Sequence, residues 1–172
     1  MSYAVVRTDK MFGTDNRAGL VSVRYQPEVA GEATPTELEN GSVVLLQGLE
    51  TGEREIYVGV DVEANSDITD VVLIATPEVM RDERKRNLDQ FINEAGDPCR
   101  GYRFHKGNIF SVTKPALVGK ATPEIGDIVE LADGTKLNVA ATLTEGSTKV
   151  GEIIDINLVG KYTYFAIEVK VD

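Results

Sequence analysis

One short stretch of this chain combines basic and aromatic side chains in a way that could bind a nucleic acid. It covers residues 100–110, RGYRFHKGNIF, and includes the only histidine of the chain. Arginine and lysine side chains contact phosphates, and tyrosine and phenylalanine rings stack on unpaired bases. A strand that carried both kinds of side chain would be a nucleic-acid-reading surface in an otherwise acidic protein.

The first residues of this stretch match the opening of an RNA-recognition signature, K/R-G-F/Y-G/A-F. The match ends at Arg103, where the signature needs a small residue, and at His105 and Lys106, where it needs apolar and aromatic ones. Period-two alternation explains the stretch instead, since it places Tyr102 and Phe104 on one face of a half-buried strand and basic residues on the other. The basic face predicts an acidic partner rather than a nucleic acid.

A second basic run, RDERKR, lies just before this strand at residues 81–86. Residues 81–106 hold seven basic and five acidic residues, so this window is positive within a chain whose net charge is -10. A local positive patch suits an acidic protein surface better than a polyphosphate, which the remaining charge would repel. Together with two apolar anchors near the N-terminus, these runs give the predicted partner-binding residues: Met11, Phe12, Arg84, Lys85, Arg86, Arg103 and Lys106.

The residue types give little support to catalysis or to metal binding. Cys99 and His105 are the only cysteine and the only histidine, so they cannot supply a zinc site by themselves or form an intrachain disulfide. The sequence has no glycine-rich phosphate loop and no calcium-type loop. Carboxylates are numerous, but no pair stands out as an acid and a base. We expect no cofactor, no metal and no enzymatic activity.

Composition is typical of a globular protein outside the membrane. The first residues, MSYAVVRTDKMFG, lack the apolar core of a signal peptide, and nowhere do about 18 apolar residues follow one another. The lone cysteine suits synthesis in a reducing compartment. With 172 residues, of which 42% are hydrophobic, the chain is large enough to bury a core of its own. We expect no membrane partner.

Strand patterns dominate the first half of the chain. Residues 42–49, 54–62 and 69–75 are rich in β-branched and aromatic residues, and turn formers separate them. The short connections predict an antiparallel meander. The segments 7–19 and 26–41 carry glycines, prolines and polar turn formers, and they predict loops or extended arms.

One helix is predicted, near residues 87–95. Thr76-Pro77 resembles a helix start, and Leu88, Phe91 and Ile92 then recur at helical spacing until Gly96 ends the pattern. The run RDERKR is polar all round, so only the later part of this segment is expected to pack as a helix on the protein.

Beyond Pro98 the strand pattern returns. Lys106-Gly107 predicts a hairpin turn between the strand at 100–105 and IFSVT, and Asp133-Gly134 predicts a second one. GEIIDINLV and YTYFAIEVKV form a third hairpin, in which Phe165, Ile167 and Val169 share one face. The last four strands predict a small closed or nearly closed β-barrel.

The predicted fold is therefore mainly β, with an antiparallel N-terminal β lobe carrying one docked helix, followed by a small C-terminal β-barrel. Its predicted divisions are an N-terminal arm and first strand (1–25), the β lobe with the helix (26–98) and the barrel-like lobe (99–172).

The runs NEAGDPCRGYRFHKGNIFSVT and EIGDIVELADGTKLNV make the chain resemble the capsid decoration (cement) and head structural proteins of tailed bacteriophages, especially those of low-GC Gram-positive hosts. The resemblance covers residues 40–172. It implies a virion protein, made in the host cytoplasm, that binds the outside of the capsid and bridges major capsid subunits. It also leaves open self-association into a homo-oligomer.

Two other classes of function stay open. The nearest alternative is a small nucleic-acid- or glycan-binding β module, and an enzyme comes third. A structural protein that binds several subunits at once needs rigid β lobes, exposed aromatic and arginine anchors and an arm that orders on contact. The sequence is compatible with each of these requirements.

Overall fold

A computed structural model describes residues 3–8, 19–80, 82, 84 and 87–171. The fold is mainly β, as predicted, and helical structure in the described ranges is limited to single turns such as η3 (Ile68–Asp70), η4 (Leu88–Gln90) and η5 (Lys114–Ala116). None of the described helices is long and apolar enough to cross a membrane. The strands are β1 (Leu20–Tyr25), β2 (Glu28–Val29), β3 (Glu32–Ala33), β4 (Val43–Leu49), β5 (Ile56–Val60), β6 (Val71–Ile74), β7 (Cys99–Arg103), β8 (Ile109–Thr113), β9 (Leu117–Gly119), β10 (Ile128–Glu130), β11 (Leu137–Ala140), β12 (Lys149–Val159) and β13 (Tyr162–Val169).

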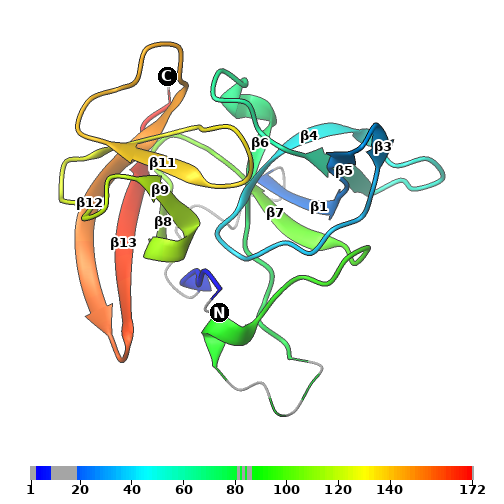
Figure 1. The fold of residues 1–172 in the computed structure, drawn as a ribbon, viewed down its shortest axis with the longest axis horizontal. Helices are drawn as coiled ribbons and strands as arrows, with labels where there is room; N and C mark the ends of the chain where they lie inside the picture. Colours follow the sequence, from blue (N-terminus) through cyan, green and yellow to red (C-terminus); the bar gives the residue numbers. More distant parts are fainter. Residues whose placement is uncertain (1–2, 9–18, 81, 83, 85–86, 172) are drawn as a thin grey trace.

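The N-terminal strands close into a barrel in the order β1-β5-β4-β6-β7 (Figure 1). The predicted meander is wrong, because β4 lies between β5 and β6 and pairs with both. The predicted all-antiparallel arrangement is also wrong, since β1 runs parallel to β5 while it runs antiparallel to β7. Barrel closure explains the parallel pair, since a closed ring of five strands cannot be antiparallel throughout. The strand that completes the ring, β1, comes from the start of the lobe, and no local turn specifies its partners.

The C-terminal strands form a six-stranded sheet in the order β8-β13-β12-β10-β11-β9, beside the barrel (Figure 1). The closed barrel predicted here is therefore in the other half of the chain. The sheet stays open because β8 and β9, which η5 joins, lie at its two opposite edges and do not pair. The strand β9 instead pairs in parallel with β11.

The first half of β4 and all of β6 are buried on both faces, which explains their continuous apolar sequences. Val44 and Val72 point into the barrel, where they pack with Val23, Tyr25 and Cys99. On the outer face, Val43, Val71 and Leu73 join a larger core to which the sheet contributes its own apolar residues, among them Val112, Val129, Ile153, Phe165 and Ile167. The barrel and the sheet thus share one apolar layer.

Two glycines make room inside the barrel. A Cβ at Gly59 would lie 2.6 Å from Val23 Cγ1, and one at Gly101 would lie 3.0 Å from both Val21 Cγ2 and Val72 Cγ2. Real side chains do not approach as closely as a Cβ at Gly59 would, because interiors are already packed at crystal density. The narrow barrel therefore needs glycine at Gly59, whereas at Gly101 a side chain would require the neighbouring valines to shift slightly.

Two of the three predicted hairpins form. Strands β10 and β11 pair across Asp133-Gly134, and β12 pairs with β13. Phe165, Ile167 and Val169 are all buried in the shared core, so their common face was predicted correctly. The third hairpin is wrong: the turn at Lys106-Gly107 exists, but β7 belongs to the barrel and β8 pairs with β13. A turn sequence shows that the chain bends, and it does not choose the partner strand.

The helix predicted near 87–95 is not formed. The described residues there make the single turn η4 and then an extended segment, in which Phe91 and Asn93 are buried. Asn93 pairs with Leu38 through two backbone hydrogen bonds of 3.0 Å. This pairing supplies the partners that a helix would have provided, and the spacing of Leu88 and Phe91 fits one 3-10 turn equally well.

We expect Gly59→Ala to destabilise the barrel, because its methyl group would overlap Val23. Overpacking of this kind costs about 1–3 kcal/mol of unfolding free energy. The matched control is Gly48→Ala on β4, where an added Cβ would meet no heavy atom within 4 Å. Chemical denaturation of both variants checks the expectation, and equal stabilities would show that the barrel interior is looser than described.

Candidate functional site

A long excursion, residues 75–98, leaves the barrel after β6 and returns to it at β7. Two buried asparagines hold its ends through hydrogen bonds. Asn40 donates from Nδ2 to the Thr76 carbonyl at 2.7 Å and accepts from the Thr76 amide at 3.0 Å. Asn93 Nδ2 donates to the Leu38 carbonyl at 2.9 Å and to Asn40 Oδ1 at 3.2 Å. The base of the excursion is therefore held rigidly to the barrel.

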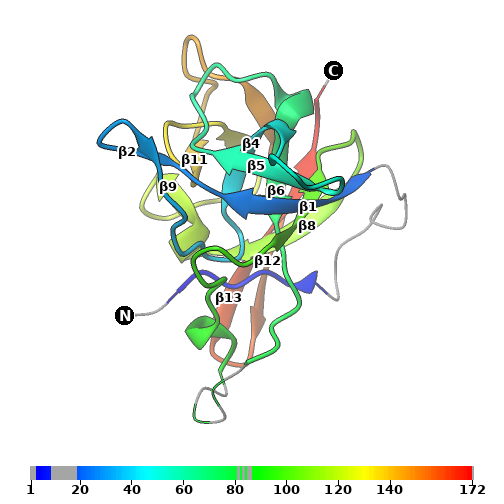
Figure 2. The same ribbon diagram turned by 90° about the vertical axis from the view of Figure 1, so that its right-hand side faces the viewer.

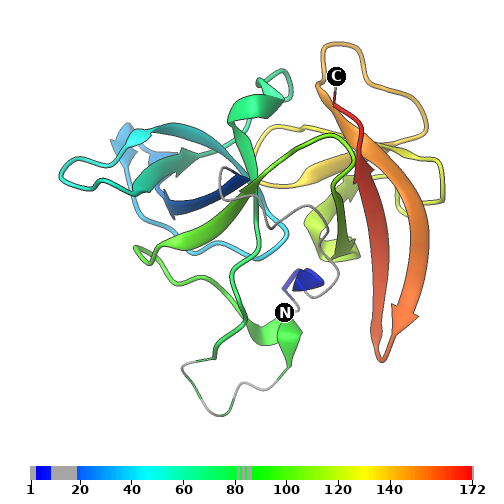
Figure 3. The same cartoon turned by 180° about the vertical axis from the view of Figure 1, so that it is seen from behind.

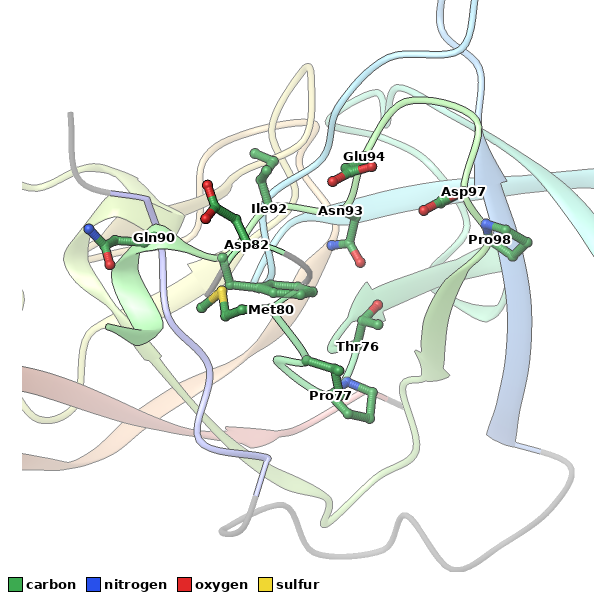
Figure 4. Close-up of a pocket in the computed structure, with 12 residues that line it drawn as sticks. Thr76, Pro77, Met80, Asp82, Gln90, Ile92, Asn93, Glu94, Asp97 and Pro98 are labelled. Carbon is green, nitrogen blue, oxygen red and sulfur yellow. The ribbon is translucent and has the colours of Figure 1, made fainter. Parts of the chain in front are cut away.

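A cavity of about 420 Å³ lies at this base, between the two ends of the excursion (Figure 4). Apolar Met80 and Phe91 line it together with the carboxylates of Asp82, Glu94 and Asp97. These carboxylates already have interaction partners, Asp82 with Arg84 at 2.9 Å among them. Within the described ranges no group of three or more potential ligands could hold a metal ion. The cavity is best described as space left by the packing of the excursion.

A second groove, of about 640 Å³, lies beside it on the barrel and is named here the arginine groove. Arg54, Arg100 and Arg103 line it together with one carboxylate, Glu55, and Leu20 and Tyr57 provide apolar surface. Arg103 is half-buried, and its Nη1 donates to the Thr69 carbonyl at 2.7 Å. This groove collects positive charge from β7 and from the residues before β5.

A third groove, of about 620 Å³, lies at the end of the β12–β13 hairpin and is named here the hairpin-tip groove. Figures 1 and 3 show this hairpin extending well past the other strands of its sheet. Val159 and Tyr162 from the hairpin line the groove together with Leu88 of the excursion and Val6 of the N-terminal segment. Three segments that are distant in sequence thus build one surface.

Asp89 holds these three segments together. Its carboxylate accepts hydrogen bonds from Tyr162 Oη at 2.9 Å and from Lys161 Nζ at 3.2 Å, and its backbone carbonyl accepts from the Tyr3 amide at 3.1 Å. Figure 2 shows η4 beside the end of the hairpin. Partial burial raises the pKa of Asp89, but the hydrogen bonds from Tyr162 and Lys161 outweigh it, and the pKa lies below its usual value.

Apolar side chains remain exposed around this junction. Leu158 is 74% exposed, Val159 45% and Leu88 39%. Basic and aromatic groups lie among them, with the Arg7 guanidinium 5.3 Å from the centre of the Tyr164 ring and Lys161 over the ring of Tyr162. Exposed apolar anchors with aromatic and cationic neighbours on a rigid support are typical of a protein-binding surface.

The predicted partner-binding residues are only partly brought together. Arg103 lies in the arginine groove, whereas Arg84 and Lys106 are exposed and line neither named groove. The remaining predicted residues lie outside the described ranges: Met11, Phe12, Lys85 and Arg86. Residues 9–18, the greater part of the predicted arm, lie outside them as well.

The groove arginines Arg54 and Arg100 and the tip residues Leu158 and Val159 were not among the residues predicted from the sequence. Arg100 stands in the stretch that was singled out, so its neighbours could have suggested it. Arg54 lies near Arg100 only because β1 pairs with β5 on one side and with β7 on the other, and the sequence does not show these pairings. Leu158 and Val159 directly precede the Gly160-Lys161 turn, where exposed apolar residues are a recognisable sign of a binding surface.

The single cysteine is not suited to nucleophilic chemistry. Cys99 is buried in the barrel interior, and burial, with a smaller effect of Asp97, raises the pKa of its thiol to about 12. The thiolate is the reactive form, so this thiol is inert near neutral pH.

Comparison with known proteins identifies no relative: no family model, no curated protein and no solved structure matches this chain. Any statement about function therefore depends on the surfaces described above and on the sequence resemblance.

We expect Tyr162→Phe to loosen the junction at Asp89. The variant loses a hydrogen bond to a charged group, which is worth about 1.5–3 kcal/mol when buried and less at this half-buried position. Tyr57→Phe is the matched control, because Tyr57 is also half-buried and its hydroxyl makes no hydrogen bond in the described structure. Chemical denaturation near neutral pH measures the difference between the two variants.

The effect of Tyr162→Phe should also depend on pH. The pKa of Asp89 is lowered in the folded state from an ordinary value of 3.8, so ionised Asp89 contributes stability above about pH 4. That contribution is lost as pH falls through the lowered pKa. The stability gap between wild type and Tyr162→Phe should narrow in acid, and a gap that is constant with pH would show that the hydroxyl does not act through the carboxylate.

Proposed function

We propose that this protein is a non-enzymatic structural protein that binds the outer surface of a tailed-phage capsid and stabilises the shell by bridging major capsid subunits. The observation that carries this proposal is the hairpin-tip groove with its exposed apolar rim. The resemblance of residues 40–172 to capsid decoration and head proteins supplies the identity of the partner. The location that follows is the capsid exterior.

The rigidity of the tip supports a docking role. The junction at Asp89 fixes the hairpin, the excursion and the N-terminal segment in one arrangement before any partner arrives. Anchors on a preorganised backbone lose less conformational entropy on binding, and more of their contact energy then appears as affinity. Val159, which lines the groove, and Leu158, on the opposite face of the hairpin tip, would act as the apolar anchors, since burying such a side chain contributes about 1.5–3 kcal/mol.

A capsid lattice also suits weak individual contacts. One tip with two or three apolar anchors binds a single subunit with modest affinity. If the protein contacts several subunits at once, its overall affinity for the capsid is much higher, although each contact is of the same kind. Exposed ion pairs add only about 0.2–1 kcal/mol each. Moderate salt should therefore slow association more than it weakens the final complex.

The alternative function is a small nucleic-acid- or glycan-binding β module. The arginine groove favours it, because three arginines beside Tyr57 resemble a site for a phosphate backbone. The net charge of -10 opposes it, since a long polyanion would meet repulsion outside the groove. We therefore rank it second.

The test is co-sedimentation with purified capsids that lack the protein. We expect wild type to bind, and Leu158→Ser/Val159→Ser to bind about tenfold more weakly or worse, because each lost anchor removes apolar burial. The control is Ile125→Ser/Leu143→Ser, which changes two exposed apolar residues, 64% and 46% exposed, away from the tip.

A nucleic-acid filter-binding assay at the same ionic strength completes the experiment. Binding to nucleic acid but not to capsids would overturn the proposal in favour of the alternative. Equal loss of capsid binding in the tip and control variants would show that the tip is not the contact surface.

A further inference from the structure

We propose that the arginine groove binds a short acidic segment of a protein partner, one that carries apolar side chains between its carboxylates. This goes beyond the proposed function, because it assigns a second binding surface and the chemical class of its ligand. It uses none of the residues of the hairpin-tip groove.

Strand pairing brings the arginines together. On β1, Ser22 lies opposite Arg100 of β7 on one side and opposite Ile56 of β5 on the other. Neighbouring strands are about 4.8 Å apart, so β5 and β7 are separated by only about 10 Å across β1. Arg54 stands two residues before Ile56, and its side chain lines the same groove as Arg100 and Arg103. One extended segment could contact all three.

The arginines of this groove form no ion pairs within the described part of the chain. Arg24 pairs with Glu50, and Arg84 pairs with Asp82. In contrast, within the described part of the chain the exposed side chains of Arg54 and Arg100 engage in no ion pair or hydrogen bond. Arg103 is oriented by the Thr69 carbonyl through Nη1 alone, so its other donors stay available. Planar guanidinium groups recognise carboxylates through paired hydrogen bonds.

The surroundings define the rest of the ligand. Leu20, which is 41% exposed, and half-buried Tyr57 offer apolar surface between the charges. A ligand with apolar residues between its carboxylates would cover this surface. Arginine and tyrosine are also enriched among the residues that contribute most of the binding energy in protein interfaces.

A nucleic acid fits these surroundings less well than a short peptide. Glu55 lines the groove itself beside Arg54, and a smaller adjoining groove of about 480 Å³ adds Glu53. A polyphosphate that tracked along the barrel would have to cross these carboxylates. A short peptide can instead place an uncharged residue beside Glu55 and direct its carboxylates to the arginines.

Fluorescence anisotropy with the full chain tests the proposal. The probe is a fluorescein-labelled, glutamate-rich decapeptide that carries phenylalanines between the glutamates. We expect saturable binding to wild type and a loss of about tenfold or more for Arg54→Gln/Arg100→Gln, because hydrogen bonds to charged groups are the stronger class. Both side chains are exposed, and the Arg100 amide that donates to Thr76 Oγ1 is retained, so the variant should unfold at the wild-type temperature.

Three comparisons decide the outcome. Arg84→Gln, an exposed arginine outside the groove, should bind the peptide like wild type. A peptide with glutamine in place of each glutamate should bind much more weakly. Equal binding of the two peptides, or undiminished binding by the double variant, would overturn the proposal.

Other occupants would also be recognised. Stronger binding of a single-stranded oligonucleotide than of the peptide would assign the groove to nucleic acid. Self-association in sedimentation velocity that Arg54→Gln/Arg100→Gln abolishes would assign it to a second copy of the chain. Either result overturns the acidic-segment proposal. The peptide assay uses no capsids, so its failure and a failure of capsid binding are separate results.

Discussion

The structure depends on one apolar layer shared by the barrel and the sheet. Strands β4 and β6 contribute one side of it with Val43, Val71 and Leu73, and the sheet contributes the other with residues such as Val129 and Ile167. Because each strand alternates its side chains, the same two strands also fill the barrel interior through Val44 and Val72. A shift of either strand by one residue would exchange these two sets of contacts, so the layer fixes the register of both halves of the molecule.

Both candidate surfaces follow from this layer. The strand residues that build it are occupied by packing, so the chain presents binding groups on segments that leave it. The excursion between β6 and β7 is one such segment, and its ends are tied to the barrel by Asn40 and Asn93. The end of the β12–β13 hairpin is another, and Asp89 joins it to the excursion. The arginine groove lies on the outer face of β1, β5 and β7, which contribute no fully buried residue to the shared core.

The strands were predictable because alternation and turn residues are local properties. The hairpins at Asp133-Gly134 and Gly160-Lys161 were predicted correctly, and alternation also gave the inward face of Phe165, Ile167 and Val169 on β13. Partners brought together over long distances were not predictable. The parallel pairing of β1 with β5 and the separation of β7 from β8 have no local signature. The helix failed for the same reason, because Asn93 finds its partner at Leu38, far away in the sequence. Of the residues that line the arginine groove, Arg103 was among the predicted partner-binding residues. The place of Arg54 in this groove depends on the pairing of β1 with β5, which was not predicted.

The parallel pairing of β1 with β5 affects how the chain must acquire its structure during synthesis. β1 is made before the other strands of the barrel, but it pairs on its other side with β7, so the ring cannot close until about Arg103 has been made. The outer faces of β4 and β6 stay uncovered still longer, because the sheet that covers them is completed only when β13 inserts between β8 and β12. A chain dominated by such distant pairings folds slowly and exposes apolar strands while it does so. Translation speed and chaperone access are therefore expected to influence the yield of this protein more than its final stability would suggest.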